Sequence, residues 1–149
     1  MNRLLVVLDA SAVIELVLGT GVGARIRDRV ADPRVSLHGP ELVDLEVLNV
    51  LRRYERLGTV PPDRAREACR NLVDLDLARH SHMPLLERVW TRRPNLTAYD
   101  AAYVVLAEVL DAPLLTTDGR LARVPKLPIT VEVFHTPDSA ALDIGGSLD

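Results

Sequence analysis

The sequence is poor in aromatic residues and cysteine, and it lacks a long apolar segment. Aromatic residues make up 3% of its 149 residues, so a core has to be built from Leu, Val and Ala. Cys69 is the single cysteine, which excludes an intrachain disulfide and a cysteine-based zinc site and is typical of a reducing compartment. No run approaches the roughly 18 apolar residues of a membrane-spanning helix.

The chain also lacks a strong charge of either sign. Its net charge is −3 and its pI about 5.8. Bulk electrostatics therefore do not attract nucleic acid or an anionic membrane, and such a partner has to be met by a local patch. The apolar run near the N-terminus is too short for a signal peptide and is interrupted by Asp9. We expect a soluble, cytoplasmic protein.

The residues that are present predict one globular α/β domain. The chain is 48% hydrophobic and 26% charged, and short apolar runs alternate with amphipathic segments. Right-handed crossovers place such strands in one sheet. We predict a three-layer α/β/α domain over residues 1–135 with a central, mainly parallel sheet, followed by a C-terminal tail at 136–149. The predicted strands are 4–8, 35–38, 75–80, 113–117 and 127–133; the predicted helices are 12–18, 24–30, 40–57, 63–73, 83–92 (with Trp90 as a core anchor) and 97–108.

An acid follows the first predicted strand directly. Residues 4–8 are apolar without a break and lead into Asp9, a pattern typical of a strand buried on both faces. Asp9 then lies at the carboxyl end of the strand, where ligands bind in open α/β sheets. The simpler interpretation is that Asp9 or Ser11 only caps the helix that follows.

Two other acids occupy comparable places. Asp118 follows the apolar pair Leu114-Leu115, and taken alone it would be a turn residue or a helix cap. Thr97 and Asp100 have the spacing of a capping box. The helix that Asp100 opens is apolar on nearly all sides through Leu106, which predicts that it is buried. Asp100 is therefore expected at the N-terminal end of a core helix.

Glu46 lies within the apolar face of a predicted helix, whereas Asp44 falls on the opposite face. A carboxylate in an apolar stripe is costly to bury unless something compensates it. Arg53 on the same side is one possible partner, and a position in a metal or catalytic site is the other interpretation. The stripe itself is formed by Leu42, Val43, Val50, Tyr54 and Leu57.

Taken together, these positions predict a metal site. Four converging carboxylates would repel one another unless a cation compensated them. Mg²⁺ and Mn²⁺ prefer such oxygen ligands, and they can activate water for in-line attack on a phosphodiester. The predicted catalytic and metal-binding residues are Asp9, Glu46, Asp100 and Asp118.

Other candidate motifs are weaker. The glycines at residues 19–23 form an incomplete phosphate loop and follow a helix. His80 and His82 resemble a metal pair only superficially, and a surface loop is the better prediction for them. Basic residues that could contact phosphate or simply be solvated are Arg92, Arg93, Arg120, Arg123 and Lys126.

Four motifs in order resemble the PIN-domain nucleases, and among them the VapC-type toxins of type II toxin–antitoxin systems. The motifs are Asp9-Ala10-Ser11, Glu46 within residues 40–48, Leu96-Thr97-Ala98-Tyr99-Asp100-Ala101-Ala102-Tyr103, and Thr116-Thr117-Asp118. The resemblance covers about residues 4–133 and implies a Mg²⁺- or Mn²⁺-dependent endoribonuclease. It also implies a homodimer, an RNA substrate, a cognate VapB-type antitoxin and contact with DNA only through that antitoxin.

The resemblance also assigns roles to residues. Asp9 and Asp100 are expected as direct metal ligands. Glu46 and Asp118 are expected to act through water or to bind a second ion, and the hydroxyls of Ser11 and Thr116 to orient the carboxylates or a bound water.

Three other interpretations of these motifs fit the sequence to different degrees. A receiver domain requires a second acidic pair after the first strand, which is absent. A haloacid-dehalogenase-type phosphatase requires D-x-D, and Ser11 stands where its second acid would be. A catalytically idle PIN fold that acts only as a binding or regulatory protein remains an alternative.

Overall fold

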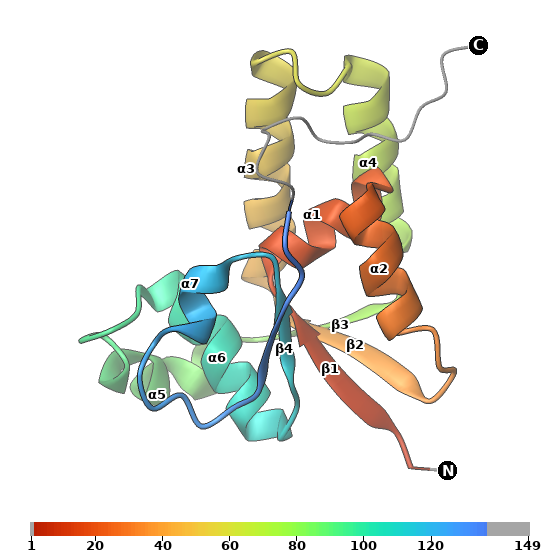
Figure 1. The fold of residues 1–149 in the computed structure, drawn as a ribbon. Helices are drawn as coiled ribbons and strands as arrows, with labels where there is room; N and C mark the ends of the chain where they lie inside the picture. The colour runs from red at the N-terminus through yellow and green to blue at the C-terminus, as the bar shows by residue number, and fades with distance from the viewer. Residues whose placement is uncertain (1, 137–149) are drawn as a thin grey trace.

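The computed structural model describes residues 2–136, and these residues build one sheet of five parallel strands in the order β3-β2-β1-β4-β5 (Figure 1). The fold class predicted from the sequence is confirmed. Apart from Thr136, the proposed tail lies outside the described residues. The strands are β1 Leu4–Leu8, β2 Val35–Pro40, β3 Leu77–His80, β4 Leu114–Thr116 and β5 Val131–Val133.

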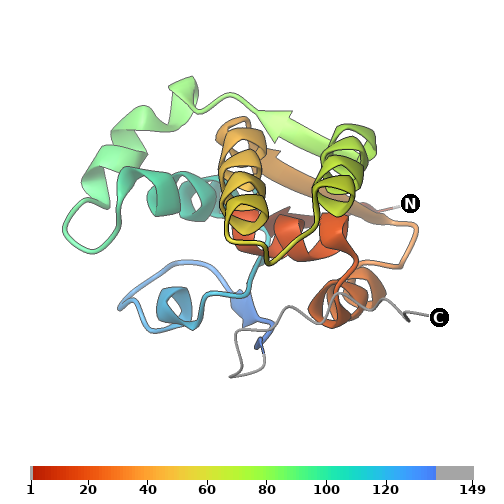
Figure 2. The same cartoon turned by 90° about the horizontal axis from the view of Figure 1, so that it is seen from above.

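Helices connect the strands and cover the sheet. Figures 1 and 2 show the first four helices gathered in one group, and the fifth and sixth packed together away from them. No helix within residues 2–136 is long and apolar enough to cross a bilayer. The helices are α1 Ala10–Leu18, α2 Gly21–Arg29, α3 Leu42–Arg56, α4 Pro62–Asp74, the 3-10 turn η1 Met83–Leu85, α5 Leu86–Thr91, α6 Ala98–Leu110 and α7 Gly119–Ala122.

The core is aliphatic, as the composition predicts. Val7, Leu8, Leu114 and Leu115 on the central strands are fully buried, because helices pack against both faces of the sheet. The prediction that Trp90 anchors the core is wrong. Its side chain is 67% exposed, because the short α5 turns Val89 inward instead.

The predicted boundaries of the helix that carries Glu46 also need correction. Pro40 belongs to β2, where it is the register partner of His80, and α3 begins only at Leu42. At its other end α3 stops at Arg56, so Leu57 is 68% exposed and is not part of the buried stripe. Gly58 has φ +73° and ends the helix as predicted. The fully buried stripe is Val43, Val47 and Leu51.

The prediction of a surface loop is wrong for His80. It is the last residue of β3 and half-buried, and its Nε2 lies 2.8 Å from Nδ1 of His38 on β2. The sequence shows the two histidines as unrelated. They become neighbours because β2 and β3 pair in parallel.

Candidate active site

Asp9 lies at the centre of a cluster of polar side chains at the carboxyl end of β1. It is the N-cap of α1 and only 7% exposed. Its Oδ1 accepts hydrogen bonds from the Ser11 hydroxyl at 2.6 Å and from the Ala12 N–H at 3.0 Å. Its Oδ2 accepts one from the Thr116 hydroxyl at 2.5 Å. The capping role and the position in a site therefore coexist in this residue.

Burial dominates the electrostatics of Asp9. Desolvation raises the pKa of its carboxyl from 3.8 to about 6, although the three hydrogen bonds oppose that shift. The negative charge of Asp118 raises the pKa further. No cationic side chain within residues 2–136 forms an ion pair with Asp9. A bound cation would compensate this carboxylate.

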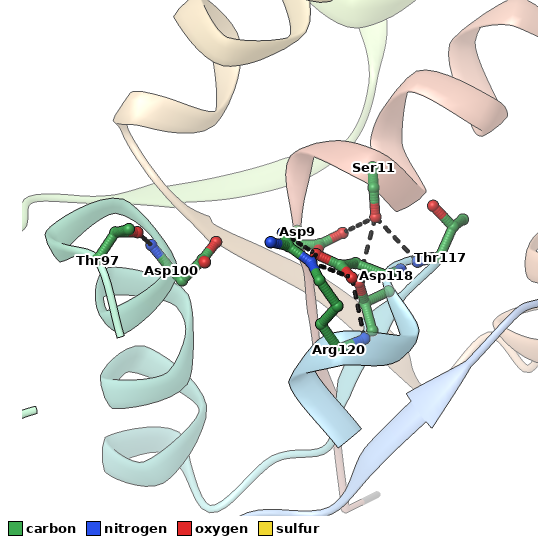
Figure 3. A network of polar contacts seen from close by, with 8 residues as sticks. Asp9, Ser11, Thr97, Asp100, Thr117, Asp118 and Arg120 are labelled. Carbon is green, nitrogen blue, oxygen red and sulfur yellow. Dashed lines mark hydrogen bonds and ion pairs between the residues drawn. The ribbon is translucent and has the colours of Figure 1, made fainter. Parts of the chain in front are cut away.

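The hydroxyls of Ser11 and Thr116 connect the turn after β1 with the turn after β4, and Figure 3 shows Ser11 beside Asp9 and Thr117. While both donate to Asp9, Ser11 Oγ accepts the Thr117 N–H at 2.9 Å and Thr116 Oγ1 accepts the Asp118 N–H at 2.9 Å. The turn after β4 is thus fixed to the turn after β1, since these strands are neighbours in the sheet. This network brings Asp118 beside Asp9.

Asp118 forms an ion pair with Arg120. It caps the four-residue helix α7, which is absent from the helices predicted from the sequence, and its side chain accepts the Arg120 N–H. The Arg120 guanidinium approaches both carboxylate oxygens, with Nε 3.0 Å from Oδ1 and Nη2 2.6 Å from Oδ2. This pairing keeps the pKa of Asp118 below its usual value. Asp118 is therefore ionised, and the positive charge of Arg120 compensates its negative charge.

Asp100 approaches the cluster from α6. Its N–H donates to Thr97 Oγ1 at 3.1 Å, which is the cap predicted from the sequence. Its carboxylate extends toward the side of the cluster where Asp9, Asp118 and Arg120 lie (Figure 3).

Glu46 enters from α3, and its partner is Tyr103 rather than Arg53. The Tyr103 hydroxyl donates to Glu46 Oε1 at 2.7 Å. Burial raises the pKa of Glu46, the hydrogen bond opposes this, and the charge of Asp100 adds to it. Arg53 makes no ion pair with Glu46, and its guanidinium lies 5.8 Å from the centroid of the Tyr54 ring.

Tyr103 is the site residue that sequence reasoning missed. It is 2% exposed on α6, three positions after Asp100, and the charges of Glu46, Asp9 and Asp100 all act on it. The available signal was a tyrosine in an otherwise apolar, buried helix, since a buried phenol hydroxyl needs a hydrogen-bond partner.

All four predicted acids thus face one edge of the sheet, but they do not form a compact cage. As they stand, no three His, Cys, Asp or Glu side chains within residues 2–136 are grouped to hold a metal ion. Two of the four are engaged elsewhere: Glu46 with Tyr103 and Asp118 with Arg120. The donor set nevertheless suits a hard divalent cation, because it consists of carboxylate and hydroxyl oxygens around a buried acid that lacks a cation.

The basic residues that could contact phosphate have different partners in the structure. Arg92 forms an ion pair with Glu108 at 3.2 Å, and Arg93 lies 4.5 Å from the Trp90 ring centroid. Arg120 contacts the cluster directly, and Arg123 is near enough for its charge to lower the pKa of Asp118. Arg120 is therefore the basic residue most directly connected to the acids.

Comparisons with known proteins identify the family of this chain. The PIN domain family model matches residues 6–127. Ribonuclease VapC1 of Mycobacterium tuberculosis is 40% identical over 130 residues, which are 87% of this chain and 97% of that protein. VapC ribonuclease Mb0985 of Mycobacterium bovis is 41% identical over 132 residues, covering 85% and 98% of the two chains.

Solved structures give the same assignment of the fold. The structure of PAE2754 from Pyrobaculum aerophilum superposes with a TM-score of 0.61 at 25% identity, over 87% of this chain and 84% of that one. The VapBC2 structure from Rickettsia felis, bound to a promoter DNA fragment, superposes with a TM-score of 0.59 at 10% identity, over 88% and 99%. Sequence and fold together place this chain in the PIN-domain family, among its VapC members.

Proposed function

We propose that this protein is a metal-dependent endoribonuclease and the toxin of a toxin–antitoxin pair. The observation that carries the proposal is the buried Asp9 carboxylate, which accepts hydrogen bonds from two hydroxyls, forms no ion pair with a cationic side chain within residues 2–136, and is faced by Asp100 and Asp118 (Figure 3). The relatives at about 40% identity are named VapC ribonucleases, which favours RNA as the substrate.

In this proposal, the four acids bind Mg²⁺ or Mn²⁺ in two different ways. Asp9 and Asp100 bind it directly, while Glu46 and Asp118 bind through water or hold a second ion. When bound, the ion supplies Lewis acidity that activates water and stabilises charge on the phosphodiester. Ser11 and Thr116 fix the orientation of Asp9, and Tyr103 fixes that of Glu46.

Metal binding should be measurable without RNA. We expect Mn²⁺ or Mg²⁺ to raise the thermal midpoint of the protein, because a ligand that binds only the folded state stabilises it by about 2.7 kcal/mol at 100 times its dissociation constant. Asp9→Asn or Asp100→Asn should remove most of that rise. Glu87→Gln changes an exposed acid on α5 and should leave the rise intact. An unchanged midpoint of the parent protein over millimolar metal would count heavily against the site.

We also propose a cognate VapB-type antitoxin, a homodimer and no direct contact with DNA. The Rickettsia felis neighbour is a VapBC complex, which favours such a partner. An antitoxin tail can place an Arg or Lys among the acids, with Arg favoured for its bidentate geometry. The rest of the tail would form an amphipathic helix beside α1 and α3, where Leu45 and Leu48 are 69% and 39% exposed.

The toxin assignment predicts growth arrest. Expression of this chain alone should stop cell growth, and Asp100→Asn should relieve the arrest because it removes a metal ligand. Coexpression with the product of the neighbouring gene should give a stable complex with little nuclease activity. Harmless expression of the intact, metal-loaded protein without a partner would refute the toxin role, and RNA cleavage in vitro would then decide the nuclease role separately.

A further inference from the structure

Arg120 is the cation that now occupies the edge of the acidic cluster. Within residues 2–136 it is the one Lys or Arg that forms an ion pair with any of the four acids. Its guanidinium lies over the space between Asp118 and Asp100 (Figure 3), and the charge of Asp100 acts on it. The Arg120 side chain is nevertheless 77% exposed, against 26% for Asp118.

The same local pair occurs elsewhere in the molecule, in the turn that precedes β2 at the amino end of that strand. Asp32 and Arg34 have the same two-residue spacing, and Arg34 also approaches both carboxylate oxygens, with Nη2 2.6 Å from Oδ2. An Asp followed two residues later by an Arg therefore forms this ion pair even outside the candidate active site. Exposed pairs of this kind contribute little to stability, so Arg120 can leave Asp118 at small cost.

We infer that Arg120 is a substrate-binding residue. It forms an ion pair with Asp118 while no divalent cation is bound. When a divalent cation binds the Asp118 carboxylate, Arg120 is released and binds a phosphate of the RNA. The inference rests on the proposed nuclease function and adds a role that the four acids do not supply. Arg120 and the metal compete for the carboxylate oxygens of Asp118, so the ion pair and a metal–carboxylate contact exclude each other.

Phosphate is the ligand that this position favours. The guanidinium fork that pairs with a carboxylate matches a phosphate equally well. The chain carries a net charge of −3, so RNA has to be met by local positive charge beside a negative site. Arg120 supplies that charge beside Asp9 and Asp118 (Figure 3), and the charge of Arg123 also acts on Asp118.

Arg120→Ala tests this inference through two measurements that should move in opposite directions. In a thermal titration without RNA, the Mn²⁺ concentration that gives half of the maximal rise should fall by about two- to fivefold, because the competing cation is gone. At saturating Mn²⁺, kcat/KM for RNA cleavage should fall by about 10- to 100-fold, because one phosphate contact is lost. Arg120→Lys should give intermediate values, since it keeps the charge and loses the fork.

Arg34→Ala is the matched control, because it removes the equivalent ion pair and should change neither measurement. If Arg120→Ala leaves the Mn²⁺ concentration for half of the maximal rise unchanged or raises it, Arg120 and Mn²⁺ do not compete for Asp118. A raised concentration would show instead that Arg120 positions Asp118 for the metal. Undiminished cleavage at saturating Mn²⁺ would overturn the phosphate role. Absence of any Mn²⁺ response in the parent protein would instead contradict the proposed metal site, and with it this inference.

Discussion

Glu46→Gln is expected to reduce RNA cleavage by at least about 100-fold while the protein still folds, since loss of even a hydrogen-bond partner of a metal ligand typically costs 10–100-fold. The substitution removes the negative charge but keeps a side-chain oxygen that can accept the Tyr103 hydroxyl hydrogen bond. The buried stripe of α3 is untouched, so the thermal midpoint should change little. Cleavage of a labelled RNA at saturating Mn²⁺, together with thermal unfolding, measures both effects.

Asp44→Asn is the matched control on the same helix. Asp44 is two residues away and forms an ion pair with Arg79 at 3.1 Å. Losing this partly exposed pair should cost no more than about 1 kcal/mol of stability and should leave cleavage unchanged. If Asp44 proved to be the essential acid and Glu46 the dispensable one, the placement of the site at this edge of the sheet would be wrong.

Gly23→Ala should strongly destabilise the fold. A Cβ built on Gly23 would lie 2.2 Å from the backbone oxygen of Glu15, so α1 and α2 would have to move apart. Overpacking of this kind typically costs about 1–3 kcal/mol, and contact with backbone rather than a flexible side chain favours the upper end. For a chain of this length, that loss lowers the thermal midpoint by roughly 5–10 °C.

Gly21→Ala distinguishes packing from a general effect of replacing glycine. Gly21 lies two residues earlier in the same helix turn, and nothing lies within 4 Å of a Cβ placed there. Alanine at this position should be neutral or stabilising by up to about 1 kcal/mol, because it restricts the unfolded chain. Equal midpoints for the two variants would show that the helices adjust freely and that the close approach at Gly23 is not a constraint.

The structure gives separate reasons for Gly19 and Gly23 in the segment 19–23, which superficially resembles a phosphate loop. Gly19 adopts φ +68° and ends α1, and Thr20 caps α2 by accepting the Gly23 N–H at 3.0 Å. The α2 helix therefore starts at Gly21, three residues earlier than the pattern of apolar residues predicts. The glycines serve a tight turn between two packed helices.

The sequence alone determined the features that depend on local chemistry. The strand at residues 4–8 was predictable because a strand covered on both faces has to be apolar throughout. Asp9 and Thr97 were recognisable as helix caps, because a cap bonds to N–H groups two or three residues further along the chain. The order of the four acidic motifs was likewise readable, since each motif is contained in a few consecutive residues.

Only the tertiary structure decided which partner each side chain has. Helical periodicity leaves both Arg53 and a functional site open as surroundings for Glu46, and the structure pairs Glu46 with Tyr103 of α6, 57 positions away. Trp90 looked like a core residue and is exposed, because periodicity over so short a helix does not fix which face turns inward. The Arg120–Asp118 pair is local, but its position over the acids follows from the pairing of β1 with β4, which joins chain segments more than 100 residues apart.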